Sequence, residues 1–144
     1  MFDGRRGLGV TEIEETALEL LLAGDDPVLA ALRRQLSTAT VVERDFTGVG
    51  FFATFAVDAS APPATRGIVL TDVMGEVTGL EHDAFFLLFA RDGVIEFLEC
   101  AILDDAWPAD AKLVRAYYVH PEKPGSPMVV ETPERDLEWT LRDQ

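Results

Sequence analysis

The chain has 144 residues, 48% of them hydrophobic and 26% charged, a balance that excludes a chain disordered throughout and fits one globular domain over residues 1–144. Twelve lysines and arginines against 26 aspartates and glutamates give a formal charge of −14, so nucleic acids and anionic membranes should repel the protein. The same charge would favour a basic protein, a polyamine or a divalent cation as partner, although an ordinary soluble acidic surface is the better explanation of the charge.

The single cysteine, Cys100, excludes an internal disulfide, and the first ten residues lack the apolar run of a signal peptide. The longest apolar stretches, such as residues 84–90, are too short to cross a bilayer as a helix. We therefore expect a cytoplasmic protein without membrane contact.

Two short amphipathic helices are expected at the start of the chain. Thr11 and Glu14 have the spacing of a capping box, and Asp26 followed by Pro27 is a typical helix start. Apolar residues recur every three or four positions after each start, and Gly24 separates the two patterns. The helices should form a hairpin that covers one face of a sheet.

The hydrophobic period changes to two from Thr40 onward, which predicts a mainly antiparallel sheet of about five strands and an α+β fold. Gly75 and Gly79 indicate turns or a bulge, and a short final helix should contain Leu137 and Trp139 after a cap at residues 132–134. The expected strand segments are residues 40–46, 49–57, 66–73, 84–90, 94–99 and 112–120.

The clearest strand pattern is a hairpin around Arg91, Asp92 and Gly93. A three-residue loop would pair Ala90 with Val94 and gather apolar residues on one face, namely Phe85, Leu87, Phe89, Ile95 and Phe97. The opposite face is also apolar, so helices or a second subunit should cover it, which is compatible with a homodimer.

No motif in the sequence identifies a reaction, and we expect no catalytic residue, metal site or cofactor. Gly48-Val49-Gly50 lacks the third glycine of a dinucleotide-binding turn and precedes a strand, so it indicates a tight turn. Cys100 could pair with His82 or His120 as a nucleophile, but an inert thiol fits its apolar strand better.

A polar cluster around the end of the hairpin is the best candidate for a binding site. Carboxylates beside an aromatic side chain can bind a divalent cation, act as acid and base, or hold a basic residue of a partner. They are more typical of an ordinary surface loop in which the tryptophan fills the core. The candidate binding residues are Glu96, Glu99, Asp104, Asp105, Trp107, Tyr118 and His120.

Residues 45–52, Asp-Phe-Thr-Gly-Val-Gly-Phe-Phe, together with Leu98-Glu99 and Trp107-Pro108, resemble segments of small acidic bacterial proteins of unassigned function. The resemblance covers the middle half of the chain. It implies a similar fold and a bacterial origin, and it supplies no substrate or catalytic residue.

The leading hypothesis is a non-enzymatic binding or regulatory protein that presents an acidic surface to a basic protein, as small bacterial immunity proteins do. The alternative is a small enzyme or ligand-binding protein with a carboxylate-lined pocket between sheet and helices. A third hypothesis, an acidic mimic of nucleic acid, requires carboxylates spaced like phosphates on one face.

Overall fold

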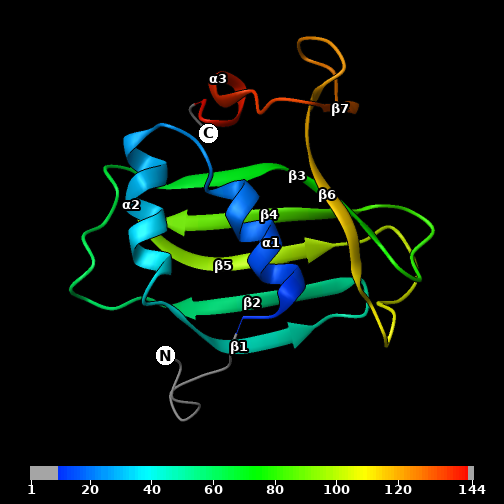
Figure 1. The fold of residues 1–144 in the computed structure, drawn as a ribbon, viewed down its shortest axis with the longest axis horizontal. Helices are drawn as coiled ribbons and strands as arrows, with labels where there is room; N and C mark the ends of the chain where they lie inside the picture. Colours follow the sequence, from blue (N-terminus) through cyan, green and yellow to red (C-terminus); the bar gives the residue numbers. More distant parts are fainter. Residues whose placement is uncertain (1–9, 143–144) are drawn as a thin grey trace.

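The computed structural model describes residues 10–142 and has an α+β fold in which two helices precede an antiparallel sheet (Figure 1). Residues 1–9, in which the sequence predicts no signal peptide, and residues 143–144 lie outside the described part. Within that part, no helix is long and apolar enough to span a membrane.

The two N-terminal helices, α1 (Glu12–Leu21) and α2 (Pro27–Leu36), begin where the sequence predicts. The capping box is confirmed, because the Thr11 amide donates to Glu14 Oε1 at 2.9 Å and the Glu14 amide donates to Thr11 Oγ1. The Asp26 carboxylate caps α2 by accepting from the Val28 amide at 2.8 Å. Local capping chemistry therefore fixes both helix starts.

The sheet contains seven strands where about five were expected, in the order β1-β2-β5-β4-β3-β6-β7 with antiparallel neighbours throughout. The strands are β1 (Thr40–Phe46), β2 (Gly50–Ala56), β3 (Ile68–Val77), β4 (Ala84–Arg91), β5 (Val94–Ala101), β6 (Leu113–Pro121) and β7 (Val129–Thr132).

The end of the chain differs from the prediction. The unpredicted strand β7 has only four residues and pairs with β6 alone. The final helix, α3 (Leu137–Thr140), is capped by the Asp136 carboxylate, which accepts from the Trp139 amide, and not by residues 132–134. Both elements are too short to carry a readable hydrophobic period.

Strand β3 runs through Gly75, where the sequence predicted a turn or a bulge, and its pairing with β4 is irregular between Leu70 and Val73 instead. A Cβ atom on Gly75 would lie 2.8 Å from side-chain atoms of both Leu113 and Phe86. The glycine therefore permits close approach of β6 and β4.

The predicted turn of the β4–β5 hairpin is wrong by one residue. Arg91 pairs with Val94 across a two-residue turn, in which Asp92 and Gly93 both have positive φ. A bulge near Glu96 restores the pairing of Phe89 with Phe97, but Ile95 is buried under the helices and not on the Phe97 face. The bulge corrects the register that this turn alone would produce.

The helices cover one face of the sheet, and the apolar core lies between them (Figure 1). This confirms that the second apolar face of the hairpin is covered, and α1 and α2 provide the cover. The strand residues buried there include Phe51, Ala53, Leu70, Phe86, Leu88, Ile95, Leu98 and Cys100.

A buried glutamine joins α2 to the hairpin turn. The Gln35 side chain is fully buried; its Nε2 donates to the Gly93 carbonyl at 2.7 Å and its Oε1 accepts from the Ile95 amide at 2.9 Å. The Gly93 carbonyl also accepts from the Ala64 amide at 2.8 Å, so the Gln35 side chain adds to the hydrogen bonds around the turn. They fix the helical layer relative to β5.

Candidate functional site

The side of the sheet opposite the helices carries a strip of partly exposed apolar side chains. We call this side the open face; strand alternation places on it Phe52, Val69, Met74, Phe85, Leu87, Phe89 and Phe97. The rings of Phe89 and Phe97 stack with centroids 4.4 Å apart, and Phe52 meets Phe97 edge-on at 5.5 Å. The aromatic strip is therefore continuous across β2, β5 and β4.

Glu99 lies within this strip. It pairs with Phe52 of β2 on one side and with Leu87 of β4 on the other. No residue of the described chain provides its carboxylate with a hydrogen bond or ion pair, and partial burial raises its pKa. A carboxylate in this position is stabilised by any cation that reaches it over the open face.

The edges of the open face are charged and mostly acidic. Glu43 and Asp45 pair with Thr54 and Phe52, which places both carboxylates on this side of β1. Glu96 accepts from Arg91 at 3.2 Å at the hairpin end. The face thus combines an apolar centre with an acidic rim, the anatomy of many protein interfaces.

The β6 side of the face is held by side-chain pairs. Arg115 forms a bidentate ion pair with Glu131 and lies 4.4 Å from the centre of the Tyr117 ring. The Tyr117 hydroxyl donates to Asp83, and burial together with this bond raises the pKa of the tyrosine. These residues form an ordered border beside Met74.

The structure does not bring the predicted binding residues together. Glu96 and Glu99 lie on the open face, whereas Asp104 accepts from the backbone amides of Glu81 and His82 in a neighbouring loop, at 2.7 and 3.1 Å. These bonds lower the pKa of Asp104. Asp105 is exposed in the same loop.

Trp107 packs on the helix side of the sheet. Its ring meets Phe51 edge-on with centroids 5.3 Å apart, and it lines a hollow of about 420 Å³ beside the start of α1. The same hollow contains the ion pair of Glu14 and Arg44, in which both carboxylate oxygens accept from the guanidinium at 2.7 Å. Glu14 is completely buried, so the pair is part of the core.

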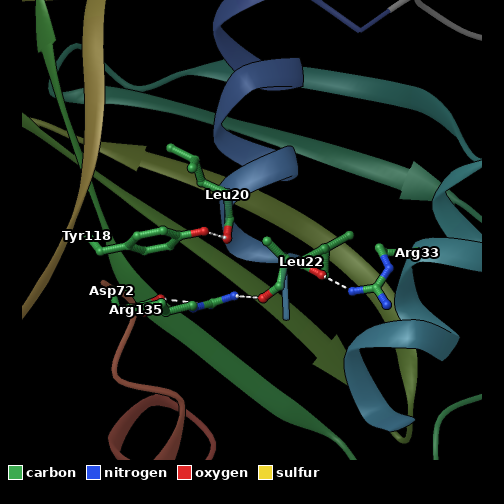
Figure 2. Close-up of polar contacts among 7 residues, drawn as sticks. Leu20, Leu22, Arg33, Asp72, Tyr118 and Arg135 are labelled. Atoms are coloured by element: carbon green, nitrogen blue, oxygen red, sulfur yellow. Dashed lines mark hydrogen bonds and ion pairs between the residues drawn. The ribbon is translucent and has the colours of Figure 1, made fainter. Parts of the chain in front are cut away.

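Tyr118 has a structural role at the end of α1 (Figure 2). Its hydroxyl donates to the Leu20 carbonyl at 2.6 Å, and its ring lies 5.2 Å below the Arg135 guanidinium. Arg135 forms a bidentate pair with the fully buried Asp72, with both N···O distances 2.9 Å, and also donates to Ala23. Side chains thus add hydrogen bonds to backbone carbonyls at the C-terminal end of α1.

His120 lies on β6 and lines a hollow of about 560 Å³ with the β6–β7 loop and α3. His82 is a surface residue, with its side chain 56% exposed and Nδ1 3.4 Å from Asp104. Cys100 is 1% exposed on the helix side, and burial raises its pKa to about 12. This is the environment of an inert thiol.

The glycine motif is structural. Gly50 has φ of +134°, and a Cβ atom there would lie 1.9 Å from the Cys100 carbonyl oxygen. Trp107 packs on Phe51 of the same motif, and Pro108 touches the position of a Cβ on Gly79. The segments that carry the sequence resemblance therefore hold β2, β5 and the following loop together.

Several important residues are absent from the candidates that sequence patterns suggest. The pairs Glu14–Arg44 and Asp72–Arg135 join residues 30 and 63 positions apart, so no local spacing reveals them. The phenylalanines of β4 on the open face were predictable from sequence. Residues 84–90 are apolar throughout, and neighbouring side chains of a strand point to opposite faces, so both faces are predicted to be apolar. In residues 10–142, no group of three or more His, Cys, Asp or Glu side chains could hold a metal ion.

Comparison with protein-family models, curated proteins and solved structures finds no match for this chain. Any function must therefore be inferred from the residues themselves.

Proposed function

We propose that this is a non-enzymatic, acidic binding protein that docks a basic protein partner on the open face. The observation that carries the proposal is Glu99, a carboxylate without a described partner inside a continuous phenylalanine strip. An arginine or lysine of the partner would neutralise Glu99 and lie against the rings of Phe52 and Phe97, which favours cations.

Two further features support a basic partner over a second copy of this chain. The formal charge of −14 attracts a basic protein at long range and repels an identical subunit. Face-to-face pairing of two copies would also bring two Glu99 carboxylates into one apolar interface, which is unfavourable while both are ionised. A homodimer through the open face is the competing arrangement.

The alternative of a carboxylate-lined catalytic pocket has less support. Trp107 and His120 line two different hollows, and neither hollow contains any of the four candidate carboxylates. Catalysis by paired carboxylates requires the two groups to reach one substrate.

The test is affinity capture from cells of the source organism with the wild type and two single variants. Glu99→Gln removes the charge at the centre of the face, and Glu122→Gln removes one exposed charge in the β6–β7 loop. We expect a partner that is retained by wild type and Glu122→Gln, lost with Glu99→Gln, and weakened by salt. Equal capture by all three proteins would contradict the proposal, and sedimentation as a dimer that Glu99→Gln stabilises would favour self-association.

A further inference from the structure

An arginine, a carboxylate and an aromatic ring form a compact group near the end of α1 (Figure 2). The Arg135 guanidinium donates two hydrogen bonds to the Asp72 carboxylate, and its carbon atom lies 5.2 Å from the centre of the Tyr118 ring. A guanidinium can make both contacts because its edge carries paired N–H donors and its flat face is weakly hydrated. We call such a group an arginine triad.

The border of the open face contains a second arginine triad. Arg115 donates to the two carboxylate oxygens of Glu131, at 2.9 and 2.7 Å, and lies 4.4 Å from the centre of the Tyr117 ring. The two lysines of the sequence, Lys112 and Lys123, are exposed, and residues 10–142 give neither side chain a hydrogen bond or ion pair. In both triads the cation is therefore an arginine, and neither lysine takes this role.

Glu99 has two of the three parts of such a triad. It lies directly opposite Phe52 in the pairing of β2 with β5, which places the two Cβ atoms about 5 Å apart. Phe97 is two residues earlier on β5 and therefore on the same face, and its ring meets the Phe52 ring edge-on. All three side chains are partly exposed. The carboxylate and the rings are in place without an arginine.

The arginines of the strands have other partners. Arg91 and Arg115 are paired with carboxylates at the hairpin end and at the β6 border, and Arg44 of β1 is paired on the helix side. No residue from 10 to 142 gives Glu99 a hydrogen bond or an ion pair. A cation that completes this triad therefore has to come from outside the described chain.

We propose that Glu99, Phe52 and Phe97 bind one arginine side chain of the partner protein, and that the site selects arginine over lysine. This inference rests on the proposed function, because it names the residue with which the partner enters the open face. The guanidinium would donate two hydrogen bonds to Glu99 and lie against the rings, as in the two internal triads. A lysine ammonium is more strongly hydrated and lacks the paired donors, so it would lose more hydration for fewer contacts.

The probes are the Nα-acetyl amides of arginine, lysine and citrulline, and the citrulline side chain resembles that of arginine without its charge. NMR titrations of the wild type would follow the ring signals of Phe52 and Phe97 and the carboxyl carbon of Glu99. We expect the arginine probe to shift all three and to bind about tenfold more tightly than either of the others. It should also lower the pKa of Glu99, because a bound cation favours the ionised form.

Two variants separate the contribution of the charge from that of the ring. Glu99→Gln should weaken binding of the arginine probe by about tenfold or more. Phe52→Leu keeps an apolar side chain, so it should reduce the preference for arginine over lysine while lysine binding stays unchanged. Phe46→Leu is the matched control, since Phe46 is an exposed ring that packs on Phe51 on the helix side, and it should bind like wild type.

Equal binding of the arginine and lysine probes would overturn this inference and leave the proposed function standing. Shifts that persist in Glu99→Gln, shifts at Tyr117 in place of Phe52, or no shift at Phe52 and Phe97 with any probe would also overturn it. A preference for arginine without a captured partner would support the guanidinium site and contradict the proposed function. The two failures are therefore distinguishable.

Discussion

The two faces of the sheet are built from the same strands, yet they differ in what completes them. On the helix side, Phe86 and Leu88 are fully buried by elements of the chain itself. On the open face, their neighbours Phe85, Leu87 and Phe89 remain partly exposed although they are equally apolar. The comparison shows that a strand with apolar residues on both faces forms one core here and leaves its other face partly exposed.

The sharpest test of this comparison uses two adjacent phenylalanines of β4. Phe86→Ala should lower the free energy of unfolding by about 3–5 kcal/mol because it creates a cavity in the core. Phe85→Ala should lower it by only about 1–2 kcal/mol, since the side chain is partly exposed and mainly strand propensity is lost. Urea denaturation of both variants measures the difference. Equal losses would show that the open face is a second core and not a surface.

The parts of the fold that sequence predicted correctly depend on local chemistry. The capping residues Thr11 and Asp26 act within three positions of themselves, and the alternation of residues 84–90 is a property of one strand. The hairpin register depends on a bulge near Glu96, next to which the Ile95 amide donates to the distant Gln35 side chain. The turn sequence does not reveal this contact. It therefore predicted the wrong loop length and the wrong face for Ile95.

The candidate site was less predictable for the same reason. Four candidates follow the hairpin in sequence or strand order, but each lies in a different environment. Asp104 caps a loop, Trp107 packs on the core, Tyr118 contacts the end of α1, and His120 lines a separate hollow. Glu99 became distinctive only through its neighbours on other strands, Phe52 and Leu87. Which groups converge is decided by strand order, which no local pattern encodes.

The buried ion pair on the helix side and the exposed ion pair beside the open face should differ in their contribution to stability. Asp72→Ala would leave the Arg135 guanidinium buried without its partner, and should lower the free energy of unfolding by about 3–5 kcal/mol. The double variant Asp72→Leu/Arg135→Met should recover much of this loss, because no uncompensated charge remains. At the border of the open face, Glu131→Gln should change stability little, because its pair with Arg115 is exposed. Thermal and urea denaturation would measure all three, and a large loss in Glu131→Gln would contradict the contrast.

The pH dependence of stability tests whether Cys100 is buried on the helix side of β5. Its raised pKa, about 12 against 9.0 for the free group, means that the folded state binds the thiol proton more tightly than the unfolded state. The free energy of unfolding should therefore fall as the pH rises from 9 toward 12, by about 1 kcal/mol at pH 10. Cys100→Ala should show a shallower decline, and subtracting its profile removes the contributions of Tyr117 and Tyr118. Parallel profiles, or rapid modification of the native thiol at pH 8, would place Cys100 outside the core.

Substitution of Glu99, the residue before Cys100 on β5, should have the smallest effect on stability and the most informative one. Its pKa is raised by burial, so the folded state holds the proton more tightly and the free energy of unfolding falls as the pH rises through that pKa. At neutral pH the ionised carboxylate therefore weakens the folded state slightly, and Glu99→Gln should be as stable as the wild type or more stable. The urea midpoint at pH 7 measures this, with Glu122→Gln as the exposed control. A gain in stability together with loss of the captured partner would show a residue kept for binding at the expense of folding. A loss of stability with the partner retained would mean that Glu99 supports the sheet, and that the open face requires another explanation.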